Sequence, residues 1–94
     1  MPSANDLTSQ LVMELSEAKT WPEQFKARLD EGLDLGRQIK DADERIEALA
    51  KRARKLIQEL GSELGCGHPR TRMVYQGMVD MLIEWYTFKD SLEQ

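Results

Sequence analysis

The sequence contains little of the chemistry that most enzymes and metal proteins use. Its 94 residues include a single cysteine, Cys66, and a single histidine, His68. A structural zinc site needs four ligands, and this pair supplies two at most. His68 has no serine or aspartate at a recognisable catalytic spacing, and one cysteine forms no disulfide within the chain. We therefore expect no catalysis, no metal and no cofactor.

Cys66 and His68 lie in a glycine-rich segment, 61–69, that reads as a loop. We interpret Cys66 as a small buried thiol and His68 as a capping residue in a tight turn. The alternative is a metal site completed by a symmetric dimer, which would bring two of each residue together.

Long apolar runs are also missing, and no segment approaches the roughly 20 residues that a membrane span needs. The chain starts without the basic residues and apolar core of a secretory signal, so we expect a cytoplasmic protein. The net charge of −4 argues against direct binding of nucleic acid. A local basic cluster follows a stretch of the same helix in which basic and acidic residues are interleaved, so we interpret it as part of a solvated face of mixed charge; contact with phosphates or with an acidic partner is the alternative. The cluster comprises Lys51, Arg52, Arg54 and Lys55.

What the sequence does contain is helical periodicity along nearly its whole length. Nothing in the chain alternates with the period of a strand, so the predicted fold is all-α. The length allows one domain, residues 1–94, and we expect helices at about 5–19, 22–61 and 69–92. Thr20 and Glu23 are spaced as a capping box, which predicts the start of the second helix.

The segment 22–61 is predicted to be one long helix, because apolar residues recur in it at steps of three and four. Gly32 and Gly36 are its only strong breakers, and they have two interpretations. We favour a close approach to another helix; the alternative is a bend. The short loop that follows predicts an antiparallel helical hairpin with the last helix, to which a short N-terminal helix is added. The periodic residues are Ile39, Ala42, Ile46, Leu49, Ala53, Leu56 and Leu60.

The last predicted helix carries two adjacent apolar rows. The first row is predicted to face the long helix, and its members are Val74, Met78, Met81, Trp85, Phe88 and Leu92. The second row runs beside it and consists of Tyr75, Val79, Leu82 and Tyr86. A helix that is apolar around most of its circumference must be covered on most sides. We therefore expect a homodimeric helical bundle or a bound protein partner, with partner-binding residues Tyr75, Val79, Leu82, Tyr86 and Met78.

Part of this region resembles a known family. Cys66-Gly67-His68-Pro69, followed by Arg72, Tyr75 and a methionine-rich helix around Val79-Asp80-Met81, is similar to the C-terminal half of TraM-type quorum-sensing anti-activators. In size and character the chain is also similar to QslA-type anti-activators. The resemblance covers about thirty residues. It implies an all-helical dimer that binds a LuxR-type transcription factor and stops it from working.

The leading functional hypothesis is therefore a non-catalytic protein-interaction module that sequesters or inhibits its partner. A small secretion or export chaperone is the alternative, because the same surface would cover an aggregation-prone helix of a partner. A metal-dependent or catalytic protein is the third class, and it ranks last.

Overall fold

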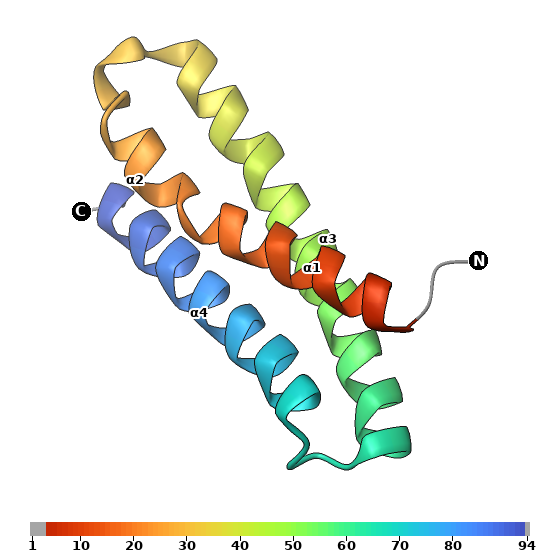
Figure 1. Ribbon diagram of the computed structural model, residues 1–94. Helices are drawn as coiled ribbons and strands as arrows, with labels where there is room; N and C mark the ends of the chain where they lie inside the picture. The colour runs from red at the N-terminus through yellow and green to blue at the C-terminus, as the bar shows by residue number, and fades with distance from the viewer. Residues whose placement is uncertain (1–3, 94) are drawn as a thin grey trace.

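Every regular element of the computed structural model, which describes residues 4–93, is a helix (Figure 1). The main helices are α1 (Ala4–Lys19), α2 (Trp21–Lys26), α3 (Leu33–Leu64) and α4 (Pro69–Leu92), with a short 3₁₀ turn, η1 (Leu29–Glu31). The all-α fold and the hairpin of α3 and α4 are confirmed. The ends of the predicted domain, residues 1–3 and 94, lie outside the described residues.

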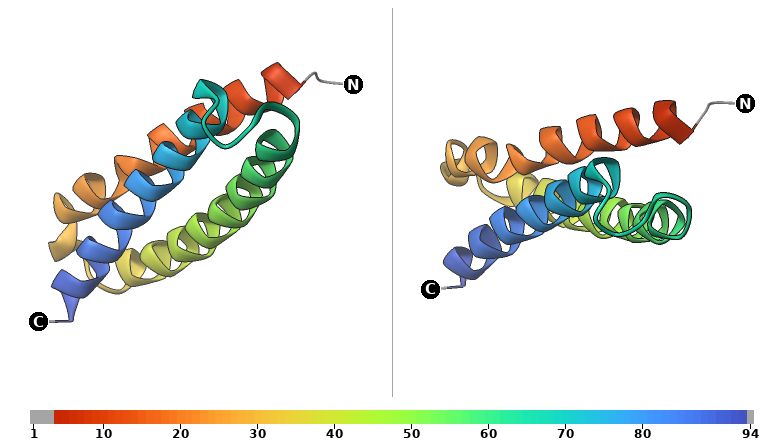
Figure 2. Two further views of the ribbon diagram at one scale, coloured as in Figure 1. Left: turned by 90° about the horizontal axis from the view of Figure 1, so that it is seen from below. Right: turned by 60° about the horizontal axis from the view of Figure 1, so that its bottom comes forward.

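The three long helices form two layers. α3 and α4 lie side by side and antiparallel, and α1 lies across one side of this pair, as the right-hand view of Figure 2 shows. α1 contacts α4 more extensively than it contacts α3. The predicted N-terminal helix is therefore present beside the hairpin, and it covers one side of α4.

The predicted core rows of α3 and α4 are buried against each other. On α4, four of the six predicted residues are at most 1% exposed, and only Leu92, at the end of the helix, is largely exposed. The periodic residues of α3 are buried, apart from Ile39 and Leu56, which are partly buried. Phe25 of α2 stacks on Phe88 and meets Trp85 edge-on, with ring centroids 6.2 and 5.9 Å apart. The recurrence of apolar residues at steps of three and four therefore located the core correctly.

The prediction of one continuous helix over 22–61 is wrong. The chain leaves α2 after Lys26 and enters α3 at Leu33, and Gly32 between them has φ 88° and ψ −139°. Side chains with a Cβ are strongly disfavoured in that conformation. A Cβ added at Gly32 or Gly36 would meet nothing within 4 Å, so neither glycine marks a close helix approach. The bend was the correct interpretation, and it lies at Gly32.

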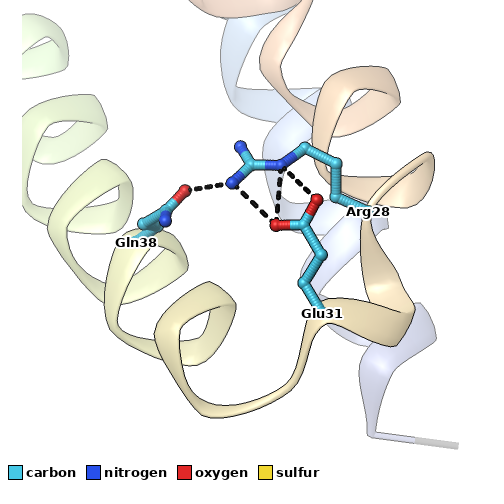
Figure 3. Close-up of polar contacts among 3 residues, drawn as sticks. All are labelled: Arg28, Glu31 and Gln38. Carbon is cyan, nitrogen blue, oxygen red and sulfur yellow. Dashed lines mark hydrogen bonds and ion pairs between the residues drawn. The ribbon is translucent and has the colours of Figure 1, made fainter.

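Hydrogen bonds among Arg28, Glu31 and Gln38 connect the two sides of this bend (Figure 3). The Arg28 guanidinium donates to both carboxylate oxygens of Glu31 at 3.0–3.2 Å and to Oε1 of Gln38, in the second turn of α3, at 2.7 Å. The Glu31 carboxylate raises the pKa of Arg28. These hydrogen bonds link the end of α2 to the second turn of α3 across the bend, while Phe25 packs α2 against α4.

The predicted capping box at Thr20 is also absent. Thr20 has a helical conformation, its hydroxyl donates to the Glu17 carbonyl at 2.7 Å, and Gln24 donates to that hydroxyl at 3.0 Å. The second helix does begin at Trp21, as predicted, but only Thr20 separates it from α1, because Trp21 and Phe25 continue the buried face that begins at Leu11 and Leu15.

Candidate protein-interaction surface

The two flanks of α4 have different surroundings. On one flank, Gly77 faces α1, and a Cβ there would lie 3.4 Å from Cδ1 of Leu15. Val79 is two residues further on, which turns its side chain by about 200° and points it away from α1. The second flank therefore lies on the side of the α3–α4 pair that α1 does not cover.

This uncovered flank carries the second apolar row of the sequence, which we call the α4 strip: Tyr75, Val79, Leu82 and Tyr86. The two tyrosines at its ends are 54% and 39% exposed, and the two aliphatic residues between them are partly buried against the core. Ile83, which is 58% exposed, widens the strip. The structure thus brings four of the five predicted binding residues together on one open surface.

Met78, the fifth predicted binding residue, does not belong to this surface. It is 8% exposed and packs within the core between α3 and α4. The sequence placed it in the core row as well as among the partner-binding residues, and the burial shows that its place is the core. Its thioether is therefore not available to a partner.

A pocket of about 730 Å³ opens at the end of the α4 strip nearest the α3–α4 turn. Tyr75 and Arg72 line it from α4, and Ile57 lines it from α3. The remaining lining residues are Cys66, Thr71, Met73 and Gln76. Ile57 is not among the binding residues that the sequence predicts. Its position beside the periodic Leu56 is nevertheless a signal that α3 has a second apolar edge.

Polar contacts fix the opposite end of the strip. The Tyr86 hydroxyl donates to Glu47 of α3. Nearby, Asp43 accepts from Trp85 Nε1 at 2.9 Å and pairs with Lys89 at 2.7 Å. Hydrogen bonds from Lys89 and from Trp85 hold the pKa of Asp43 below its usual value. These contacts orient Trp85 into the core and leave the Tyr86 ring at the surface.

The loop residues do not form a chemical site. Cys66 is exposed, so its interpretation as a buried thiol is wrong. Nδ1 of His68 accepts the backbone N–H of Arg70 at 3.1 Å, which confirms its capping role at the start of α4. Within residues 4–93, no three His, Cys, Asp or Glu side chains are grouped to hold a metal ion.

The basic cluster of α3 is not one surface. Arg52 pairs with Glu14 of α1 at 3.0 Å, on the α1 side of α3. Arg54, two residues on, points to the side of the α4 strip. None of the helices in the described part of the chain combines the length and the apolar character that crossing a membrane requires.

Comparison with models of known protein families, with curated proteins and with solved structures finds no significant match to this chain. A function therefore has to be inferred from the surface of the molecule and from its sequence. The α4 strip and the adjoining pocket are the surface features with the clearest chemistry: large apolar side chains, rimmed by charges and held on rigid helices.

Proposed function

We propose that this protein is a non-catalytic protein-interaction module that sequesters a protein partner through the α4 strip. One observation carries the proposal: α1 and α3 cover the core row of α4, but Tyr75, Ile83 and Tyr86 stay exposed beside Val79 and Leu82. Contiguous exposed apolar side chains with a charged rim commonly mark interaction sites.

The form of the surface suits an amphipathic helix of a partner. Such a helix binds by placing apolar anchors, spaced three and four residues apart, into a groove between two helices. Here the pocket beside Ile57 of α3 and Tyr75 of α4 offers room for a large anchor, and the α4 strip continues the apolar surface from it. Tyrosines are frequent hot-spot residues because they bury a large area with few rotatable bonds.

Sequestration requires no catalytic group. A partner held on the strip is withdrawn from its other binding equilibria by mass action. The resemblance of the segment 66–81 to quorum-sensing anti-activators suggests the partner class: a LuxR-type transcription factor in the cytoplasm, whose active state would be depleted by this binding.

The test is a pull-down from native extract with the tagged full chain and two matched variants. Leu82→Glu puts a charge at the centre of the strip, where it is hard to desolvate in a complex. Met13→Glu makes the same change on α1, at a side chain that is 73% exposed and far from the strip. We expect Leu82→Glu to lower the recovered partner by more than about tenfold, and Met13→Glu to leave it unchanged.

Circular dichroism of both variants shows whether the helices persist. A Leu82→Glu variant that keeps its helix content and its partner contradicts the proposal. A captured transcription factor supports the anti-activator hypothesis. A captured secreted subunit would instead support an export chaperone that acts through the same strip.

A further inference from the structure

The order of side chains along the α4 strip has a symmetry of its own. Tyrosines stand at both ends, at positions 75 and 86, with Val79 and Leu82 between them. Both pairs share a midpoint between residues 80 and 81. Outside the tyrosines, on the same face, come Arg72 and Asp90, whose midpoint is residue 81. The strip therefore reads nearly the same in both directions, except that the charges at its two ends are opposite.

The charges at the two ends of the strip have no partner within the described residues. Neither Arg72 nor Asp90 makes a side-chain hydrogen bond or an ion pair with any of residues 4–93, and both are exposed. Each also has the less favourable sign for its own helix, since a cation lies in the first turn of α4 and an anion in the last. Within residues 4–93, an isolated subunit therefore offers neither charge an ion-pair partner.

Charged residues of α3 beside the α4 strip have the same order of signs as Arg72 and Asp90. Arg54 and Glu47 lie two turns apart on one side of α3, and Glu47 sits at the Tyr86 end through its hydrogen bond. Arg54 lies one turn from Ile57, which shares the pocket with Tyr75. The half of the open face near the α3–α4 turn thus carries Arg72 and Arg54. The other half carries Asp90 and Glu47, with Lys89 paired to Asp43 and with Lys40 two turns before Glu47 on the same side of α3.

From this pattern we infer that, in the absence of a partner, the α4 strip is covered by the α4 strip of a second copy of this chain, antiparallel to the first. Reversal places tyrosine beside tyrosine and aliphatic beside aliphatic side chains, with the twofold axis near residues 80 and 81. It places Arg72 beside Asp90 of the second copy, twice. Each charge then also lies near the helix end of favourable sign. A parallel pairing would instead set like charges together.

This inference deepens the proposed function, because it rests on the same strip being a protein-binding surface. Self-pairing and partner binding then exclude each other, and the partner must displace the second copy. The apparent affinity for the partner accordingly decreases as the concentration of this protein rises above its own dimer dissociation constant.

Charge reversal tests the pairing in solution. We expect sedimentation equilibrium of the pure protein to show a monomer–dimer equilibrium at micromolar concentration. Arg72→Glu or Asp90→Lys alone should raise the dimer dissociation constant by at least about tenfold, because each change creates two like-charge contacts. The double variant, and an equimolar mixture of the two single variants, should return it to within about threefold of the original value. Arg37→Glu, an exposed reversal elsewhere on α3, should have no effect.

Cysteine cross-linking tests the direction. In the antiparallel pair the two copies of Cys66 lie at opposite ends, so mild oxidation of the native protein should give no covalent dimer. Val79→Cys combined with Cys66→Ser puts a thiol beside the twofold axis, within reach of its copy, and should give a covalent dimer. Cross-linking through Cys66 but not through Val79→Cys would overturn the antiparallel arrangement.

The outcomes separate this inference from the proposed function. A protein that is monomeric throughout the micromolar range, or single reversals that leave the dimer unchanged, would overturn the pairing. If the monomeric protein still loses its captured partner through Leu82→Glu, the proposed function stands without the self-pairing. A dimer with the expected reversal pattern that captures no partner would uphold the pairing and contradict the proposed function.

Discussion

The two rows of α4 are both apolar in sequence, yet one is buried and the other is open. On the α1 flank, Gly77 has no side chain, and Leu15, which is fully buried, packs directly against the helix. On the open flank, Tyr75 and Tyr86 project outward and no helix of the described chain covers them. Apolar character alone therefore does not decide whether one side of a helix is buried. A neighbouring helix must also be able to come close, and here only one flank permits it.

The boundary between the core and the surface of α4 can be tested at two adjacent residues. Trp85→Ala should lower the free energy of unfolding by about 3–5 kcal/mol, because a fully buried aromatic side chain is replaced by a cavity. Glu84→Ala, at the exposed neighbouring position, should change it by no more than about 0.5 kcal/mol. Urea unfolding at neutral pH measures both. Similar losses from the two substitutions would contradict the assignment of the buried face.

A second pair of substitutions compares the space available on the α1 side of α4 with that at a neighbouring exposed position. Gly77→Leu inserts a side chain into space that Leu15 occupies, and overpacking of this kind typically costs about 1–3 kcal/mol. Gln76→Leu, one residue earlier and exposed, adds a similar side chain where there is room and should stay within about 0.5 kcal/mol. Thermal unfolding followed by circular dichroism distinguishes them. If Gly77→Leu were as stable as Gln76→Leu, α1 would not lie against α4 at this position.

The smallest expected effect concerns the ion pair between Asp43 and Lys89, which lies at the Tyr86 end of the α4 strip. Asp43→Asn keeps an acceptor for Trp85 but loses the ion pair with Lys89, so it should cost about 1 kcal/mol at pH 7. Because the fold lowers the pKa of Asp43, its stabilisation is fully present above the ordinary value of about 3.9 and is lost as the pH falls through the lowered value.

The difference between Asp43→Asn and the original protein should therefore shrink as the pH falls below about 4. Denaturant titrations at pH 7 and at pH 2–3 measure this difference. Asp41→Asn serves as the control, because Asp41 is exposed on the same helix and forms no ion pair within the described residues. A constant difference at both pH values would show that the charge of Asp43 contributes nothing.

Several elements of the fold and of the candidate site were predictable from the sequence. Periodicity located α4 to within its end residues, because Pro69 and the preceding loop mark its start. It also separated the row from Val74 to Phe88, which is buried, from the α4 strip, which is open. Local signals failed where a tertiary contact was stronger. Thr20 reads as a cap, but the buried face that runs through Trp21 keeps α1 and α2 nearly continuous.

The all-α class, the α3–α4 hairpin and the two apolar rows of α4 follow from the sequence alone, because 3.6-residue periodicity and the glycine-proline turn are local properties of the chain. The tertiary structure was needed to show that α1 packs against α4 at Gly77, that Ile57 joins the open surface and that the long helix is interrupted at Gly32. Periodicity gives the width of an apolar face on one helix. It does not give the neighbour that covers this face, since that depends on whether a distant segment such as α1 can approach within contact distance.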